Sequence, residues 1–276
     1  MHDPAPSPIA STADADARLL AVLGAWEPGG VVALSGGVDS ALVLDAAARA
    51  WGANQVLAAT SRSASVPAAE LDDAARLAAH VGVEHLVLEG RELDIDAYRA
   101  NPTDRCFFCR DHLFGRLREV AAARGFPHVL DGANVDDLGD HRPGMHAARR
   151  HGVISPLLLA GLSKHWVREL ARERGLTVWD KPAEPCLSSR IPYGTPVTPE
   201  ALARIEHAER ALKALGFPVV RVRDHAPVGR IEVPADALPR LLEEATRRRA
   251  VHALREAGFA YVALDLEGFR SGNLNR

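Results

Sequence analysis

The sequence predicts an α/β protein with a parallel sheet covered by helices on both faces, followed by a smaller α+β domain. Through the first half, short apolar runs rich in β-branched residues alternate with helical segments, an order typical of such a sheet. A proline-rich stretch over residues 180–199 then marks a domain boundary. The expected organisation is a disordered lead (1–14), the α/β domain (15–182), a linker (183–198) and the small domain (199–276).

The elements of the first domain are expected from apolar periodicity and from capping residues. Ser163 has the character of a helix N-cap, so a helix is expected from there to about residue 174. In chain order we expect a helix at 15–26, a strand at 31–34, a helix at 41–48, a strand at 55–60, a helix at 68–80, strands at 85–88 and 128–130 on either side of a helix at 111–125, and a fifth strand at 153–158.

The second domain is expected to be a compact unit of the order helix, strand, strand, helix, strand. The corresponding ranges are 199–215, 219–222, 230–233, 237–257 and 261–264.

Composition narrows the class of protein. The chain has 276 residues, of which 47% are hydrophobic and 25% charged, and its formal net charge is −3, whereas nucleic-acid-binding proteins are usually more basic. Three cysteines would leave one over in any disulfide framework. No apolar run approaches the roughly 20 residues of a membrane span, and the first eight residues lack the features of a signal peptide. We therefore expect a cytoplasmic protein with neither a membrane nor a nucleic-acid partner.

The segment at residues 35–40 forms a strand–turn–helix junction suited to phosphate. Its glycines permit a tight turn, and backbone N–H groups at the start of the following helix favour an anion. A glycine-rich turn without a ligand is the alternative. The hexapeptide matches the SGGxDS motif of the PP-loop ATP pyrophosphatases, and this resemblance implies that ATP is bound by Ser35, Gly36, Gly37, Asp39 and Ser40.

An acidic segment from Asp131 to Asp140 follows the predicted strand at 128–130. Magnesium prefers carboxylate oxygens and substrate phosphates, and ligands of parallel sheets lie at the carboxyl ends of the strands. We therefore expect Asp131 to contribute to the ATP site with Mg²⁺, and Arg142 to be available for a phosphate or carboxylate. A solvated acidic turn is the alternative.

The three cysteines form the second chemical feature. Cys106 and Cys109 have the CxxC spacing of a redox pair, half a zinc site or part of an iron–sulfur site, although two ordinary buried cysteines would look the same. Cys186 lies in a proline-rich loop, where Arg190 would favour its thiolate. His112 leaves a Cys₃His zinc site open.

Four blocks together resemble the LarE family: SGGVDS, DGANVDDLGDHRPG, EPCLSSRIPYG and DLEGFRSGNLN. This resemblance implies an ATP-dependent sulfur transferase that matures the nickel-pincer nucleotide cofactor of lactate racemase. Such an enzyme adenylates a carboxylate of pyridinium-3,5-biscarboxylic acid mononucleotide and releases pyrophosphate. Sulfur then replaces the adenylate and gives a thiocarboxylate.

The resemblance offers two sources of sulfur. In single-cysteine members the residue matching Cys186 gives up its own sulfur and ends as dehydroalanine. This chain resembles the three-cysteine members, in which thiolates matching Cys106, Cys109 and Cys186 hold a 4Fe-4S cluster with one open iron. The three sulfurs are then expected to converge beside the ATP site.

The remaining expectations concern the substrate and the partners. Arg221 and Arg223 share one face of a strand by their spacing and are expected to bind the substrate phosphate, with Glu209 as a metal or substrate contact. Arg190 is expected to contact ATP. The family resemblance implies a homo-oligomer, a hexamer, that works with other enzymes of nickel-pincer nucleotide biosynthesis.

Three other functions compete with this interpretation. A PP-loop tRNA thiolase would need a basic RNA-binding surface or extra zinc motifs. An amide-forming ligase of the NAD-synthetase type would leave the cysteines without a task. A non-catalytic nucleotide sensor would bind ATP without releasing pyrophosphate.

Overall fold

The computed structural model describes residues 8–139 and 143–270, which form two compact units. Asp140 and Arg142 lie outside the described residues. The first unit comprises Met1–Ser63, Ala68–Arg91 and Asp104–Ala183. The second comprises Glu184–Arg276 together with two short segments from the first half of the chain, Ala64–Pro67 and Glu92–Thr103.

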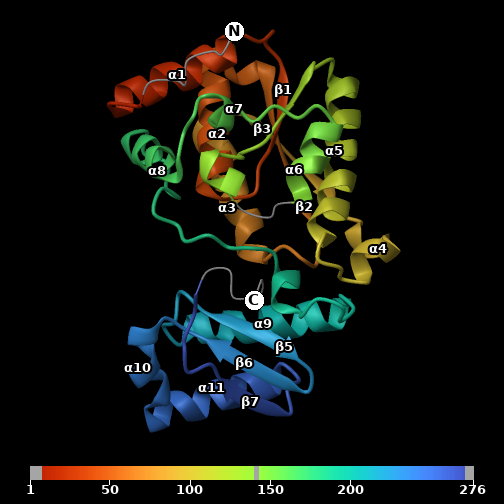
Figure 1. The fold of residues 1–276 in the computed structure, drawn as a ribbon, viewed down its shortest axis with the longest axis vertical. Coiled ribbons are helices and arrows are strands. Elements are labelled where there is room, and N and C mark those ends of the chain that lie inside the picture. Colours follow the sequence, from red (N-terminus) through yellow and green to blue (C-terminus); the bar gives the residue numbers. More distant parts are fainter. Residues whose placement is uncertain (1–7, 140–142, 271–276) are drawn as a thin grey trace. The chain divides into compact units, whose positions relative to one another are not determined.

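The first unit is built on a four-stranded parallel sheet of order β3-β2-β1-β4. The expected parallel sheet of an α/β fold is thereby confirmed, with four of the five expected strands. Central β1 pairs on one side with β2 and on the other with β4, which follows α5 in the chain (Figure 1). The strands are β1 (Gly30–Ala33), β2 (Val56–Arg62), β3 (Glu84–Glu89) and β4 (His128–Leu130).

Helices cover both faces of this sheet, with α1, α2 and α8 on one side and α5 and α6 on the other (Figure 1). Alternate strand residues enter two separate cores: Val32 and Ala58 pack with α1, α2, α3 and α8, whereas Val31 and Leu57 pack with α5 and α6. The helices are α1 (Thr12–Gly24), α2 (Val38–Trp51), α3 (Ala68–Val81), α5 (Arg105–Arg124), α6 (Pro143–Arg150), α7 (Pro156–Leu159) and α8 (Lys164–Glu173).

Three local features of the first unit differ from the sequence expectation. The expected fifth strand at 153–158 is reduced to one parallel bridge between Leu130 and Ile154, because Pro156 lacks an N–H for the ladder and begins α7. Helix α5 begins at Arg105, earlier than expected, so the CxxC lies within its first turns. Helix α1 begins at Thr12, inside the expected disordered lead, with Ser11 as its N-cap.

The second unit contains a three-stranded sheet of order β5-β6-β7, in which β5 and β6 are antiparallel and β7 is parallel to β6. Its core joins α9 and α11 to this sheet. The expected helix at 237–257 is divided, because Glu243 leaves the helical conformation, with φ −52 and ψ 134. The elements are α4 (Asp96–Arg99), α9 (Pro199–Ala214), β5 (Arg221–His225), β6 (Val228–Glu232), α10 (Leu238–Leu242), α11 (Glu244–Glu256) and β7 (Tyr261–Leu264).

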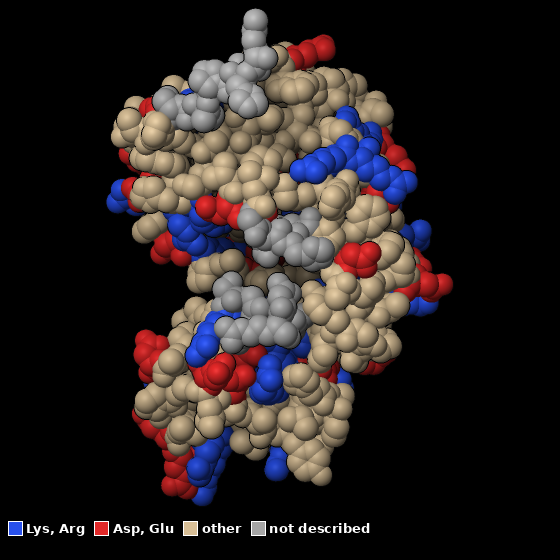
Figure 2. All heavy atoms as spheres, in the orientation of Figure 1, with Lys and Arg blue, Asp and Glu red and all other residues tan. Residues whose placement is uncertain are grey.

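The residues expected to form a linker, 183–198, contribute buried side chains to the second unit. The short 3₁₀ helix η4 (Leu187–Arg190) lies here, and the side chains of Leu187, Ser188, Arg190 and Ile191 are buried. Positive and negative side chains are interspersed over the described part of the face drawn in Figure 2. Among the described residues, no helix combines the length and the apolar character needed to cross a membrane.

Candidate functional site

The phosphate loop, residues 35–40, connects β1 to α2 and is held closed by its own hydroxyl groups. Ser40 Oγ accepts a hydrogen bond from Ser35 N at 3.1 Å and donates to the carbonyl of Gly37 at 3.1 Å. Gly36 has φ +78, and a Cβ there would lie 2.6 Å from the carbonyl oxygen of Glu70. Both the left-handed backbone and the close approach of α3 therefore require glycine at this position.

The turn after β4 packs directly against the phosphate loop. A Cβ on Gly132 would lie 2.8 Å from Ser40 N, so the two turns touch at the start of α2. Asp39 is held from two sides, because its Oδ1 accepts from Asn134 Nδ2 at 3.1 Å and its Oδ2 accepts from Lys164 Nζ. The structure therefore brings Asp39 and the acidic segment together, as the strand-end argument predicted.

Within the described part of this segment, Asp131 is the carboxylate with a buried oxygen that accepts no hydrogen bond. Its Oδ1 accepts from Ser155 Oγ at 2.6 Å and from Ala133 N at 3.2 Å. Its Oδ2 is buried without a hydrogen bond and lies 3.7 Å from Arg110 Nη1. A buried carboxylate oxygen without a hydrogen bond, beside the phosphate loop, fits a hard cation or a ligand donor.

Two further carboxylates among the described residues of the segment, Asp136 and Asp137, serve the turn itself. Asp137 accepts from Asn134 N at 3.0 Å, and Asp136 accepts from Lys164 N at 2.5 Å. They therefore fix the turn and the start of α8, which leaves Asp39 and Asp131 as the magnesium candidates.

Lys181 fastens the phosphate loop to α3. Its Nζ donates to the carbonyl of Gly36 at 3.2 Å and to Asp73 at 2.5 Å, and it lies 2.6 Å from Glu70. Burial alone would lower the pKa of Lys181, but the hydrogen bonds with Asp73 and Glu70 outweigh it and the pKa is raised. Lys181 is therefore a charged anchor of the loop.

Sequence reasoning missed both lysines of this site. Lys164 follows the predicted N-cap, Ser163, but nothing in the sequence links it to Asp39, 125 residues away. Lys181 stands in the proline-rich stretch, where a solvated lysine is the ordinary expectation.

The CxxC lies on α5 in the first unit, and Cys186 belongs to the second. Cys106 is exposed and Cys109 half-buried, and none of the three cysteines is in a disulfide. Residues three apart share a helix face, so Cys106 and Cys109 can serve one metal or cluster. His112 follows on α5, with its Nε2 buried and without a hydrogen-bond partner among the described residues. Within the described residues, no group of three or more His, Cys, Asp or Glu side chains is arranged to hold a metal ion.

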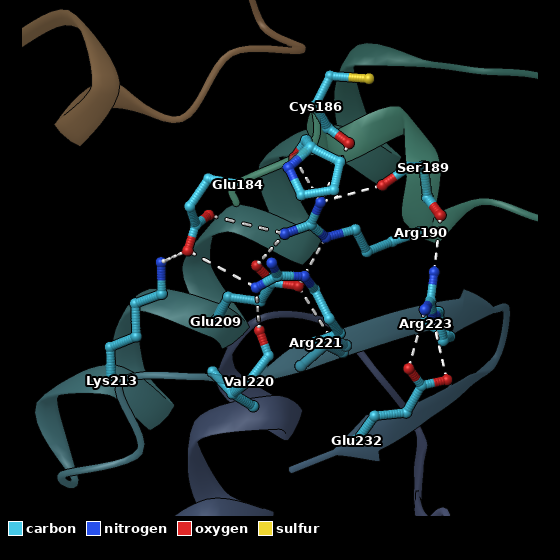
Figure 3. Close-up of polar contacts among 12 residues, drawn as sticks. Glu184, Cys186, Ser189, Arg190, Glu209, Lys213, Val220, Arg221, Arg223 and Glu232 are labelled. Atoms are coloured by element: carbon cyan, nitrogen blue, oxygen red, sulfur yellow. Dashed lines mark hydrogen bonds and ion pairs between the residues drawn. The ribbon is translucent and has the colours of Figure 1, made fainter. Parts of the chain in front are cut away.

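Arg190 ties the Cys186 loop to α9 (Figure 3). Its side chain is fully buried, and Nε and Nη2 each donate to Glu209 at 2.9 Å. Its Nη1 donates to the carbonyls of Pro185 at 2.6 Å and Cys186 at 3.1 Å. The Cys186 side chain points away from this arginine cluster (Figure 3). Glu209 and Arg190, expected separately at substrate and ATP, are thus partners in one buried ion pair.

Arg221 and Arg223 project from the same face of β5, as their spacing predicted. Arg223 makes two hydrogen bonds of 2.9 Å with Glu232, and Arg221 lies 3.6 Å from Glu184. Burial lowers the pKa of Arg221, and the charge of Arg190 adds to this.

Glu184 completes the charged cluster of the second unit. Burial would raise the pKa of Glu184, but the hydrogen bond from Lys213 and the charges of Arg221, Lys213 and Arg190 outweigh it, and the pKa is lowered. The cluster formed by Glu184, Arg190, Glu209, Lys213, Arg221, Arg223 and Glu232 is shown in Figure 3.

Comparison with known proteins gives this geometry a context, although no protein-family model matches the chain. An uncharacterised protein of Synechocystis sp. is 44% identical over 246 residues, which cover 89% of this chain and 91% of that protein. The pyridinium-3,5-bisthiocarboxylic acid mononucleotide synthase of Lactiplantibacillus plantarum is 40% identical over 247 residues, or 88% of each chain. An NH₃-dependent NAD⁺ synthetase of Methanococcoides burtonii is 37% identical over 76 residues, 28% of each chain.

The phosphate loop with its SGGxDS sequence and the parallel sheet beneath it are those of a PP-loop protein. Because identity to the Lactiplantibacillus synthase reaches 40% and extends over 88% of both proteins, the chain belongs to the LarE family of PP-loop enzymes.

Proposed function

We propose that this protein is an ATP-dependent sulfur transferase that converts pyridinium-3,5-biscarboxylic acid mononucleotide to a thiocarboxylate for the nickel-pincer nucleotide cofactor. The observation that carries the proposal is the 40% identity to the Lactiplantibacillus synthase over 88% of both chains. The reaction has two steps. A substrate carboxylate attacks the α-phosphorus of ATP and pyrophosphate leaves, and a sulfur nucleophile then displaces AMP from the acyl adenylate.

The first unit supplies the groups for adenylation. Amides and hydroxyls of the phosphate loop would bind the pyrophosphate portion of ATP. Asp39 and the buried Oδ2 of Asp131 would hold Mg²⁺, which neutralises phosphate charge when bound. Lys164, already in contact with Asp39, is the nearby cation for the phosphates. This arrangement supports nucleotide activation and disfavours a solvated acidic turn.

The second unit supplies the groups for the sulfur step and for substrate binding. Cys186 is the proposed nucleophile or sulfur ligand, held by a loop whose carbonyls accept from Arg190. Arg221 and Arg223 are proposed to bind the substrate phosphate, with Glu209 as a further contact. The expected contact between Arg190 and ATP likewise stands as a proposal.

The proposed resident cofactor is a 4Fe-4S cluster on Cys106, Cys109 and Cys186. Thiols outside any disulfide, two of them on one helix face, are chemically suited to it. When bound, such a cluster would supply a transferable sulfur atom in place of the sulfur of Cys186. Donation of the Cys186 sulfur itself is the alternative, and in that case each protein molecule would react once. We further propose a cytoplasmic homo-oligomer, a hexamer, that acts with other enzymes of the same biosynthetic route.

Pyrophosphate release and product mass test the proposal. Anaerobically purified protein, incubated with ATP, Mg²⁺ and the biscarboxylic mononucleotide, should release pyrophosphate only when the mononucleotide is present and should yield a thiocarboxylate. Asp39→Ala or Ser40→Ala should abolish AMP formation with the circular dichroism spectrum preserved. Pyrophosphate release that requires tRNA instead, or nucleotide binding without release, would replace the proposal with the thiolase or the sensor.

Iron and sulfide analysis of the same preparation separates the two sulfur sources. Cys106→Ala and Cys109→Ala should each lose iron and multiple turnover. Full multiple turnover in both variants would exclude the cluster. Zinc in place of iron would make the cysteines a structural site and move the sulfur source elsewhere.

A further inference from the structure

Ser155 occupies a helix N-cap position without acting as a cap. It directly precedes α7 (Pro156–Leu159), and serine is favoured at such a position because its oxygen can accept a hydrogen bond from the first amides of the helix. The Ser155 side chain accepts no such bond. Instead its Oγ donates to Asp131 Oδ1 at 2.6 Å, within the range of strong hydroxyl–carboxylate hydrogen bonds. The hydroxyl therefore serves the carboxylate beside the phosphate loop and not the helix.

Main-chain hydrogen bonds bring Ser155 to Asp131 and hold it there. Asp131 N donates to the carbonyl of Ile154 at 3.0 Å, and Leu158 N donates to the carbonyl of Ala133 at 3.1 Å. The turn after β4 is thus fastened to the segment around α7 through backbone atoms. Because these bonds do not involve the Ser155 side chain, the hydroxyl is not needed to form the turn.

The two carboxylate oxygens of Asp131 are in unequal surroundings. Oδ1 receives two hydrogen bonds, from Ser155 Oγ at 2.6 Å and from Ala133 N at 3.2 Å. Oδ2 is buried and accepts none, although Arg110 Nη1 lies 3.7 Å from it. Two donors on one oxygen fix the rotation of the carboxylate, so the free lone pairs of Oδ2 have a fixed position. The Arg110 side chain is 42% exposed and can turn toward water when a cation arrives.

The carboxylate that Ser155 fixes stands beside the phosphate loop, because a Cβ on the next residue, Gly132, would lie 3.0 Å from Asp39 Cβ. We propose that Ser155 is a positioning residue for Mg²⁺, whose hydroxyl holds Oδ1 of Asp131 so that Oδ2 stays free and fixed for the cation. The inference rests on the proposed function, in which Asp39 and Asp131 hold Mg²⁺. Removing a hydrogen-bond partner of a metal ligand typically weakens metal binding about 10–100-fold.

Calorimetric titration of the full-length protein with α,β-methylene-ATP tests the proposal without catalysis. A methylene group replaces the oxygen at which adenylation would cleave, so no pyrophosphate forms. Each protein is titrated once with Mn²⁺, which favours the same oxygen ligands as Mg²⁺, and once with EDTA. The ratio of the two nucleotide affinities measures the coupling between cation and nucleotide. We expect Ser155→Ala to reduce this ratio about tenfold and to leave the affinity in EDTA unchanged. Ser155→Thr keeps a hydroxyl and should keep the parent ratio.

Ser11→Ala is the matched control, because Ser11 is an N-cap of the same unit whose side chain accepts from Asp14 N at 3.2 Å. Removing this cap should lower stability, but it leaves the hydrogen bonds of Asp131 intact, so the affinity ratio should not change.

If Ser155→Ala, folded by circular dichroism, keeps the parent ratio, the hydroxyl is structural and the inference is overturned. A reduced ratio in Ser155→Thr, an equal reduction in Ser11→Ala, or a parent protein that binds the nucleotide equally well with Mn²⁺ and with EDTA would overturn it too. The titration requires neither the mononucleotide nor pyrophosphate release, so the inference and the proposed function can fail separately.

Discussion

Replacing Glu209 with glutamine tests how much the buried ion pair between Arg190 and Glu209 stabilises the second unit, including the loop that carries Cys186. The carboxylate receives two 2.9 Å hydrogen bonds from Arg190, and both side chains are at most 4% exposed. Glu209→Gln preserves the shape and an oxygen for the hydrogen bond from Val222 N, but it removes the charge. The nearest remaining carboxylate to Arg190 is that of Glu184, at 3.9 Å.

The expected loss is set by the buried charge that remains. Removing one member of a buried ion pair typically costs about 3–5 kcal/mol, because the other charge stays desolvated. With a urea dependence of about 2 kcal/mol per molar, a loss of this size lowers the unfolding midpoint of the second unit by about 2 M.

The aromatic residues allow each unit to be followed separately. All four tryptophans, Trp26, Trp51, Trp166 and Trp179, lie in the first unit, whereas all three tyrosines, Tyr98, Tyr193 and Tyr261, lie in the second. Tryptophan fluorescence therefore reports unfolding of the first unit, and the far-ultraviolet circular dichroism reports both units. We expect Glu209→Gln to shift the part of the dichroism transition that tryptophan fluorescence does not follow.

Glu244→Gln is the control for this experiment. Glu244 pairs with Arg248 on α11 with side chains 68% and 77% exposed, and such pairs contribute about 0–1 kcal/mol. If Glu209→Gln moves the midpoint of the second unit no further than Glu244→Gln does, the buried pair is dispensable and the argument from desolvation is refuted.

The remaining predictions concern the phosphate loop and pH. Lys164→Gln should lower the rate of pyrophosphate release about tenfold or more with little loss of stability, as measured by steady-state kinetics and urea unfolding. Asp131→Asn should lower turnover and raise the Mg²⁺ concentration needed for half-maximal activity, as a magnesium titration would show. An unchanged magnesium dependence would mean that the turn has no role in binding Mg²⁺. Gly36→Ala should destabilise the first unit by about 1–2 kcal/mol or more, and by more than Gly125→Ala, where φ is +70 but no atom lies within 4 Å of a Cβ. Since the pKa of Glu184 is lowered on folding, its charge stabilises the second unit at neutral pH, and this contribution disappears as the pH falls from about 4.5 through the lowered value. Glu184→Gln should therefore differ from the parent in unfolding free energy at pH 7, and much less in acid.

The parallel sheet and the phosphate loop could be predicted because their signals are local. Each strand of the first sheet is a short apolar run, and the SGGVDS turn stands between one such run and a helix. The expected strand at 153–158 is wrong as a strand because periodicity does not register that Pro156 cannot donate to a ladder. The uninterrupted helix at 237–257 is wrong for a different reason, since the helical sequence pattern continues across Glu243, whose backbone is not helical.

Long-range partnerships could not be predicted from one sequence. Spacing placed Arg221 and Arg223 on one strand face, but it did not indicate that Arg223 pairs with Glu232 across the sheet. Nor did it indicate that Tyr98 lies against Ser188, 90 residues later in the chain. Such contacts depend on how the elements pack, and no local pattern records which buried polar groups become partners.

The two lysines at the phosphate loop differ in how completely their charges are paired within the fold. Lys181 is bound to Asp73, Glu70 and the carbonyl of Gly36, and its pKa is raised, so its charge is fully committed to holding the loop. The side chain of Lys164 is 34% exposed and contacts Asp39 at the entrance of α2. A phosphate arriving at the loop can replace Asp39 as its partner with little desolvation, because Lys164 already faces water. Because Lys164 has fewer partners within the fold than Lys181 and is more exposed, we expect Lys164→Gln to lower turnover and to leave stability nearly unchanged.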